Sequence, residues 1–488
     1  MEPINCFLPY ISPEQIAPVV EELYKTGMVD KIYLMTSNPG AEPYPGCEIL
    51  PVDTLTSTQT MRSIYMRADG KNVLLYLRPG LIKFGQYALE RMATILECKY
   101  NRIVYADYYE FYKGARREHP VNDYQRGSVR DDFDFGPLLM ISYEALNTYF
   151  MRVSAETSEL KYAGLYHFRL RAASAVGEIV HLREYLYTFT EEDIRKSGEK
   201  QFDYVDPKNR EVQREMEIAF TSTLNFSKSY WRKQPQTVRF KSREFKYEAT
   251  VIIPVRNRVR TIGDAISSVF MQQTSFKFNL IIVDNHSTDG TTEVIRRYAS
   301  DDRLIHLIPE RDDLGIGGCW NMAAAHPLCG KFSVQLDSDD VYSGPDTLQK
   351  IVDTFHIEKC AMVIGTYKMT DFDLNEIPPG IIDHREWTPE NGRNNALRIN
   401  GLGAPRAFYT PILREIKMPN VSYGEDYAIG LAISRTYRIG RIYDVLYLCR
   451  RWEDNTDAAL DIRKMNEYNA YKDSLRTLEL KARGSILY

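Results

Sequence analysis

The chain has 488 residues, of which 44% are hydrophobic and 26% charged, and its formal net charge is -4. This length exceeds what one hydrophobic core supports and predicts two or three domains. The small net charge provides no basic field, so we expect no nucleic-acid partner. No stretch approaches the ~20 apolar residues that span a bilayer, and the N-terminus lacks the basic and apolar regions of a signal peptide.

The cysteine pattern also indicates the redox environment of the protein. The chain has 7 of them, scattered and without a C-x-x-C pair, a pattern that predicts neither a zinc site nor a disulfide framework. We therefore expect a reduced, cytoplasmic protein, with peripheral association at the inner face of a membrane as a further option. The sequence predicts no oligomeric state.

The first half of the chain alternates apolar runs with helical patterns. Residues 4–9 are typical of a buried strand closed by proline, a helix is expected over 13–24, and the next strand over 31–35. A further apolar run over 72–77 leads into Arg78-Pro79-Gly80. Strands that alternate with helices in this way predict a parallel α/β sheet.

The second half repeats this rhythm more clearly, after a connecting segment. That segment contains an amphipathic helical pattern over 210–226, followed by a basic, aromatic strap. Ligands of such sheets bind beyond the carboxyl ends of the strands. Strands are expected over 249–254, 280–284, 304–308 and 332–336, with helices over 261–271 and 291–298.

The two similar halves indicate an internal duplication. The predicted fold class is α/β, with two tandem Rossmann-like domains built on central, mostly parallel sheets and joined by a helical connector. The expected bounds are 1–197 for the first domain, 198–246 for the connector, 247–455 for the second domain and 456–488 for a helical tail.

An acidic cluster, Asp337-Ser338-Asp339-Asp340, follows the strand over 332–336. Side chains alternate along an extended chain, so Asp337 and Asp339 are expected to project to the same side. Two like charges held close together are costly unless a cation lies between them. A hard divalent ion that also holds a substrate diphosphate would neutralise them, whereas the alternative is a solvated Asp/Ser turn.

Three further motifs stand in order around this cluster: residues 254–258, residues 283–291 with Asp284 at a strand end, and residues 423–427 with Glu425 and Asp426. Together the four motifs resemble the family 2 glycosyltransferases of GT-A fold, over roughly 247–455. The resemblance implies an inverting hexosyltransferase that moves a sugar from a nucleotide sugar to an acceptor hydroxyl. The first half would then be a degenerate GT-A-like module.

The resemblance also assigns roles to residues. Asp426 matches the catalytic base, since an acceptor hydroxyl needs a nearby carboxylate to take its proton. The alternative for 424–426 is an acidic helix start that favours the helix dipole. The other assignments are donor binding by Pro254, Arg256, Asn257, Asp284, Asn321, Asp337 and Ser338, metal binding by Asp339 and Asp337, and acceptor binding by Glu425, Gly403 and Trp452.

The same resemblance implies ligands. The metal would be Mn2+ or Mg2+, the donor a UDP-sugar first and a GDP-sugar next, and the acceptor a glycan or glycolipid in polysaccharide biosynthesis. Leu448 stands where processive synthases have Gln in Q-x-x-R-W, so we expect non-processive transfer. The glycine-rich run 315–321 has Trp320 in place of the third glycine of G-x-G-x-x-G, so it is interpreted as the family's loop before Asn321, where backbone approaches the donor.

The first half departs from the pattern because Arg78-Pro79-Gly80 replaces the D-x-D motif. It also has acidic motifs over 105–109 and 130–136. We interpret these as structural hydrogen-bonding residues in preference to a second ligand site. We therefore expect a non-catalytic first domain. The alternatives are a bifunctional glycosyltransferase with both modules active, and a non-catalytic protein that binds a nucleotide sugar or glycan. A nucleotidylyltransferase is disfavoured because its glycine-rich start is absent after Ile253.

Overall fold

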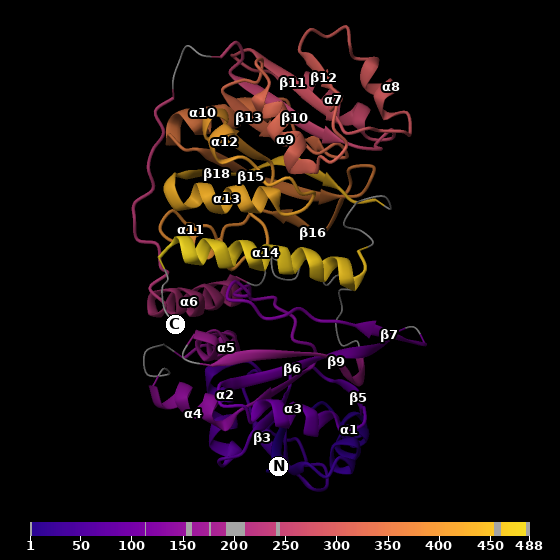
Figure 1. The fold of residues 1–488 in the computed structure, drawn as a ribbon, viewed down its shortest axis with the longest axis vertical. Coiled ribbons are helices and arrows are strands. Elements are labelled where there is room, and N and C mark those ends of the chain that lie inside the picture. The colour runs from indigo at the N-terminus through magenta and orange to yellow at the C-terminus, as the bar shows by residue number, and fades with distance from the viewer. Residues whose placement is uncertain are drawn as a thin grey trace. The chain divides into compact units, whose positions relative to one another are not determined.

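The computed structural model describes residues 2–112, 114–152, 159–174, 177–191, 210–240, 245–452 and 460–484. These residues form two compact units (Figure 1). The N-terminal unit comprises the chain through Tyr230 together with the residues from Asp461 onward, and the C-terminal unit spans Trp231–Leu460. Among the described residues, none of the helices has the length and apolar content that crossing a membrane requires.

The N-terminal unit is built on a sheet with the strand order β3-β2-β1-β4-β8-β6-β9-β5, and β7 pairs with β6. Strands β1 to β4 pair in parallel, whereas β8 is antiparallel to β4 and β6. The elements are β1 (Ile4–Pro9), α1 (Pro13–Lys25), β2 (Val29–Thr36), β3 (Cys47–Pro51), α2 (Thr58–Ala68), β4 (Val73–Tyr76), β5 (Gly80–Phe84), α3 (Ala88–Leu96), β6 (Asn101–Tyr112), β7 (Ala115–His119), β8 (Leu138–Ile141), α4 (Tyr143–Arg152), α5 (Gly164–Ser174), β9 (Glu178–Glu191), α6 (Arg210–Phe226) and α14 (Ile462–Ala482).

The C-terminal unit is built on a second sheet with the order β12-β11-β10-β13-β17-β15-β18-β14, and β16 pairs with β15. Its strands β10 to β13 pair in parallel, and β17 is antiparallel to β13 and β15. The elements are β10 (Ala249–Val255), α7 (Ile262–Phe270), β11 (Phe278–Asp284), α8 (Thr291–Arg296), β12 (Leu304–Leu307), α9 (Ile316–Ala325), β13 (Phe332–Gln335), β14 (Val341–Tyr342), α10 (Thr347–Glu358), β15 (Met362–Thr370), β16 (Glu376–Ile382), α11 (Gly392–Asn395), β17 (Arg406–Tyr409), α12 (Thr410–Ile416), α13 (Glu425–Thr436) and β18 (Ile439–Arg450).

The two sheets share one topology. Each strand of the first sheet has a counterpart at the same place in the second, nine positions later in the numbering of strands. The pairing directions agree as well, for example parallel for β6 with β9 and for β15 with β18. The prediction of two tandem, Rossmann-like α/β units with parallel-rich sheets is therefore confirmed.

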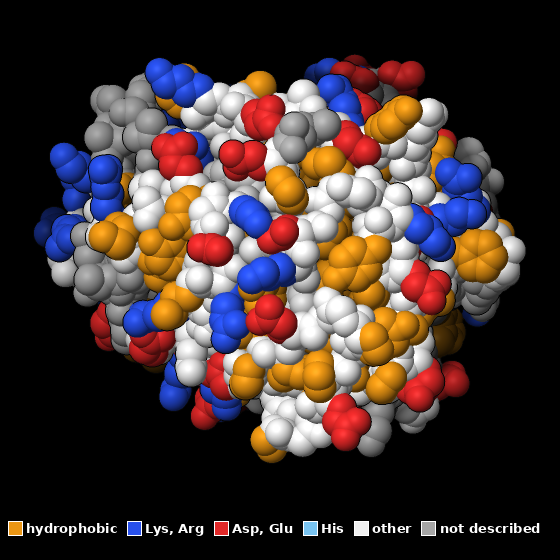
Figure 2. Space-filling view, turned by 90° about the horizontal axis from the view of Figure 1, so that it is seen from below, with side chains coloured by type: hydrophobic (Ala, Val, Ile, Leu, Met, Phe, Trp, Pro, Cys, Tyr) orange, Lys and Arg blue, Asp and Glu red, His pale blue; other side chains and the backbone are white. Residues whose placement is uncertain are grey.

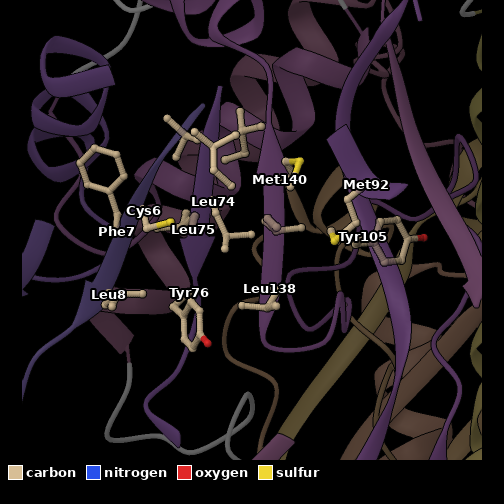
Figure 3. Packing of buried hydrophobic residues seen from close by; sticks show 14 of the residues in the cluster. Cys6, Phe7, Leu8, Leu74, Leu75, Tyr76, Met92, Tyr105, Leu138 and Met140 are labelled. Carbon is tan, nitrogen blue, oxygen red and sulfur yellow. The ribbon is translucent and has the colours of Figure 1, made fainter. Parts of the chain in front are cut away.

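The cores of these units explain why the apolar runs are continuous. Every residue of β1 and of β4 is buried, as expected for central strands that helices cover on both faces. In the N-terminal unit these strands pack beside β8, β6 and α3 (Figure 3). The packed side chains include Cys6, Phe7, Leu8, Leu74, Leu75, Tyr76, Met92, Tyr105, Leu138 and Met140.

Helix α14 belongs to the N-terminal unit although it lies at the other end of the sequence. Asp473 is fully buried there, where it accepts hydrogen bonds from Ser128 Oγ at 2.8 Å and Arg476 Nη1 at 2.7 Å. Arg130 Nε lies 3.4 Å from the same carboxylate. At Gly127 a Cβ atom would approach the Asp473 carbonyl oxygen to 2.0 Å, so only glycine allows this close packing.

The surface carries both signs of charge. On the face shown in Figure 2, basic and acidic side chains are interspersed with hydrophobic ones. This mixture agrees with the nearly balanced totals of 62 Lys and Arg and 66 Asp and Glu.

Candidate active site

The acidic cluster lies where β13 ends, at the carboxyl edge of the parallel strands of the C-terminal unit. Asp337 is held from two sides: Gln335 Nε2 donates to both of its carboxylate oxygens at 3.0 Å, and the Tyr447 hydroxyl donates to Oδ2 at 3.0 Å. Burial, with repulsion from Asp339, raises the pKa of Asp337 against the opposing effects of Arg406 and Gln335. A largely desolvated carboxylate of this kind attracts a cation.

Arg450 fixes the loop that carries the cluster. Its backbone amide donates to Asp340 Oδ1 at 2.8 Å, its Nε donates to the Asp339 carbonyl oxygen, and its Nη1 donates to Asp264 Oδ2 at 2.7 Å. The side chain of Arg450 is buried. Arg450 therefore positions the loop that carries the acidic cluster.

The cluster fits a divalent metal by its chemistry. Burial and the charges of Asp339 and Asp337 raise the pKa of Asp340 well above its usual range, which is the penalty that a bound cation would relieve. Arg258 Nε lies 3.5 Å from Asp339 Oδ2 and partly offsets the charge. Among the described residues, no three His, Cys, Asp or Glu side chains gather in a metal-binding group. Asp337 and Asp339 would hold Mn2+ or Mg2+ only with further oxygens, as from a diphosphate.

Asp284 and Asn257 occupy the neighbouring strand ends. Asp284 is fully buried, and it accepts hydrogen bonds from the Ser287 amide at 3.1 Å and Thr292 Oγ1 at 2.5 Å. Burial raises its pKa, but His306 and these donors outweigh that effect and lower it. Asn257 has a φ of 54° and accepts from the Thr288 amide at 2.8 Å. Both side chains therefore shape the loop after β11.

The other donor positions predicted at this edge are placed as follows. Pro254 lies in β10 opposite Val283, and Arg256 is exposed just after that strand. Ser338 is buried, and its carbonyl oxygen accepts from Thr261 Oγ1 at 3.0 Å. The structure thus gathers these residues with Asp337 around the carboxyl ends of β10 and β13.

Asn321 and the glycines before it require a correction. Residues 315–321 were expected to form a loop, but α9 begins at Ile316. A Cβ atom at Gly317 would lie 1.9 Å from the Pro419 carbonyl oxygen, so this glycine serves close packing of the helix. Asn321 Nδ2 donates to the Met418 carbonyl oxygen at 2.8 Å and its Oδ1 accepts from the Met418 amide at 2.9 Å. Its amide is thereby engaged in positioning the segment before α13.

The carboxylates predicted on the acceptor side begin helix α13. Gly424 precedes them with a φ of 80°, a conformation that favours glycine. Arg406 Nη1 forms an ion pair with Asp426 Oδ2 and donates to the Gly403 carbonyl oxygen at 3.1 Å. Burial of Arg406 is outweighed by Asp426, Asp337 and Glu425, so its pKa is raised. Arg406 therefore links the carboxylates of α13 to the cluster after β13.

Arg406 was not predicted from the sequence. The available signal was a charged residue at the start of the otherwise apolar run Arg406–Tyr409, which forms β17. Gly403, predicted on the acceptor side, has a φ of 104° and lies three residues before Arg406, just ahead of β17. Trp452 lies farther along, where its ring packs against Phe372 at 5.5 Å and Arg260 at 5.0 Å.

Glu425 is the least compensated carboxylate of this group. It is 9% exposed, and among the described residues its Oε2 is buried without a hydrogen-bond partner. Burial and the adjacent Asp426 raise its pKa to about 8. Because a raised pKa favours the protonated form, Glu425 is expected to be largely protonated at neutral pH and able to donate a hydrogen bond to an acceptor oxygen.

We expect Glu425→Gln to remove a pH dependence of stability. The contribution of wild-type Glu425 is fully present below the usual value of 4.5 and is lost as the pH rises through about 8. In that window the variant should gain stability over wild type by up to about 1.4 kcal/mol per pH unit. Thermal melting at a series of pH values measures this gain. The exposed Glu415→Gln should show none, and a constant offset for Glu425→Gln would contradict the prediction.

Known proteins resemble this chain over part of its length. Residues 250–415 match the family model described as glycosyl transferase family 2. TuaG of Bacillus subtilis, named as a glycosyltransferase of teichuronic acid biosynthesis, is 28% identical over 188 residues, which are 38% of this chain and 71% of TuaG. Chondroitin synthase of Escherichia coli is 27% identical over 237 residues, which are 48% of this chain and 33% of that protein.

Among solved structures, residues 1–349 of S. aureus TarS in complex with UDP-GlcNAc align with a TM-score of 0.37 and 20% identity, over 49% of this chain and 73% of that one. The region that matches the family model includes the acidic cluster Asp337-Ser338-Asp339-Asp340. Residues 250–415 of the C-terminal unit are therefore similar to the family 2 glycosyltransferases.

Proposed function

We propose that the C-terminal unit transfers a sugar from a nucleotide sugar to an acceptor hydroxyl, with inversion and with a divalent metal, one sugar at a time. The observation that carries this proposal is the convergence of two acidic groups on one arginine. Arg406 pairs with Asp426 and lies in the field of Asp337, so the groups proposed for acceptor and donor belong to one polar network.

The proposed chemistry divides between the two sides of this network. Asp337 and Asp339 would hold the metal, which when bound neutralises the charge of the leaving diphosphate. Asp426 would take the proton of the attacking hydroxyl, and Arg406 would orient that carboxylate. A single displacement inverts the sugar and requires no covalent intermediate on the enzyme. A glycan or glycolipid acceptor and a UDP-sugar, ahead of a GDP-sugar, remain the proposed substrates.

Removal of the metal is expected to abolish transfer. Chelation with EDTA followed by gel filtration should reduce the rate at least 100-fold, and added Mn2+ or Mg2+ should restore it, because the diphosphate would otherwise leave without charge neutralisation. EDTA saturated beforehand with Mn2+ serves as the control for effects of the chelator itself. Full activity of the chelated, metal-free protein would contradict the metal-dependent mechanism.

The N-terminal unit is proposed to be non-catalytic. Its counterpart of the acidic cluster contains Arg78, which donates to the Tyr108 hydroxyl at 2.9 Å. Its conspicuous acids make structural contacts: Asp107 Oδ1 accepts from the Val121 amide at 2.8 Å and lies 2.9 Å from His181 Nε2. These contacts support the interpretation that the acids stabilise loops and do not bind a donor.

The decisive test incubates the purified chain with Mn2+ and a panel of radiolabelled UDP- and GDP-sugars, with and without a mixture of oligosaccharide acceptors. We expect hydrolysis or transfer with at least one donor. Binding of a donor without release of nucleotide under any condition would favour the alternative of a non-catalytic binding protein.

A further inference from the structure

A cavity lies within the C-terminal unit, at the opposite end of α13 from Glu425 and Asp426. Its volume is about 460 Å³, within the ~300–1,000 Å³ typical of small-ligand sites. The strap around Gln236 forms one wall, and it is fixed because its amide donates to the Thr436 carbonyl oxygen at 2.9 Å and its carbonyl accepts from the Arg438 amide at 3.0 Å. The distance from Asp426 to Ser434 in its lining is about 12 Å along the helix.

The lining carries an excess of positive charge. It contains three arginines, Arg393, Arg438 and Arg441, and one carboxylate, Glu358. Glu358 lies 3.3 Å from Arg438 Nη2 and neutralises one of the three guanidinium groups. Glu386 and Asp383, which also act on Arg441, lie outside the lining, and Glu386 pairs with His384. Arginines therefore outnumber carboxylates three to one in the lining of this cavity.

Among these groups, Arg441 has the hydrogen-bonding arrangement that bears most directly on ligand binding. Its Nη1 and Nη2 donate to carbonyl oxygens, those of Leu402 at 2.8 Å and Asp383 at 3.0 Å, and not to a carboxylate. Its Nε is buried and, within the described part of the chain, has no hydrogen-bond partner. Burial lowers the pKa of Arg441 despite the neighbouring acids. An anion bound in the cavity would further stabilise the charge of this guanidinium.

Aromatic rings line the rest of the cavity. Trp387 is held rigidly, because Gly392 at the start of α11 packs so closely that a Cβ atom there would lie 2.5 Å from the indole. Helix α11 lies beside α13 (Figure 1). Tyr443 is 41% exposed, and its hydroxyl donates to the Trp387 carbonyl oxygen at 3.4 Å. Rings with an apolar face and a polar edge suit the alternating faces of a sugar.

We propose that this cavity binds an acidic sugar unit, whose carboxylate or phosphate lies on Arg441 and Arg438 and whose ring packs on Trp387 and Tyr443. That the ligand is a sugar rests on the proposed function. The cavity has a route to the reaction site: Arg441 holds Leu402, and the neighbouring Gly403 is held by the arginine that pairs with Asp426. An acidic unit of an acceptor chain is the ligand that this connection favours.

Calorimetric titration of the full chain with glucuronate, glucose 6-phosphate, glucose and inorganic phosphate tests the proposal. We expect at least one acidic sugar to bind at least tenfold more tightly than glucose and inorganic phosphate; which of the two binds identifies the acidic group. Arg438→Gln and Arg441→Lys should each weaken that binding at least tenfold, since each alters a charge-assisted hydrogen bond. The exposed Arg297→Gln should leave it unchanged.

The same titration on Asp337→Asn/Asp339→Asn separates this proposal from the proposed function. Binding should persist in that variant, and in a preparation that transfers no sugar. Loss of binding there would assign the ligand to the donor site and overturn the proposal. Equal affinity for glucose, no binding of either acidic sugar, or equal binding of inorganic phosphate would also overturn it. So would full affinity in both arginine variants.

Discussion

Asp426→Asn is expected to lower the rate of sugar transfer by about 10²–10⁴-fold, the range for loss of a general base. Asparagine has nearly the same shape as aspartate, so the first turn of α13 should persist. The asparagine side chain, however, cannot take the proton of the attacking hydroxyl. The rate of transfer under saturating donor and acceptor measures the effect.

Donor binding should remain within about threefold of wild type in this variant. The residues proposed for the donor lie at the ends of β10, β11 and β13, whereas Asp426 lies on α13 and contacts Arg406. Loss of donor affinity would contradict the role of base, because it would place Asp426 in the donor site. Asp353→Asn, at an exposed position of α10, is the matched control and should change neither quantity.

The partner of Asp426 gives a second check on the same result. Removing one member of a partly buried ion pair leaves the other charge uncompensated, which destabilises proteins. Arg406 retains the Gly403 carbonyl oxygen and the field of Asp337, so we expect only a modest fall in melting temperature. A rate loss without unfolding would then belong to the chemistry.

Much of the fold follows from local sequence signals. The helix pattern over 210–226 is reproduced as α6 without a shift, and the apolar run at 4–9 is β1. The ends of α7 differ by one residue from the expected 261–271, which is the usual uncertainty of helix termini. Buried strands and amphipathic helices can be predicted from the sequence because their hydrophobic periodicity is a local signal.

Features that depend on distant contacts were not predicted. The run 315–321 has the glycines of a loop. In the structure, however, Gly317 packs so closely against Pro419 that no side chain would fit there. Arg406 is not part of any recognisable motif. It pairs with Asp426 only because α13 places that carboxylate beside β17. The expected tail over 456–488 gives no local sign that Asp473 is buried among Ser128 and Arg130. Tertiary contacts decide these three cases.

The duplicated topology makes the number of active sites the sharpest remaining question. Both units have the same strand order, but the position after β4 holds Arg78 where the position after β13 holds Asp337 and Asp339. An arginine cannot ligate a cation. The single-site interpretation therefore predicts that all transfer depends on the C-terminal cluster.

Asp337→Asn/Asp339→Asn should accordingly lower every transfer activity of the chain at least 10³-fold, because the metal and the leaving diphosphate lose their carboxylates. Unfolding should not explain the loss. The double variant removes like charges whose repulsion and burial raise the pKa of Asp337, so its melting temperature at pH 7 should equal or exceed that of wild type. Arg78→Lys, at the matched position of the N-terminal unit, should keep transfer within about twofold. A second product that survives in the double variant, and is lost when Arg78 is changed, would instead establish two active modules.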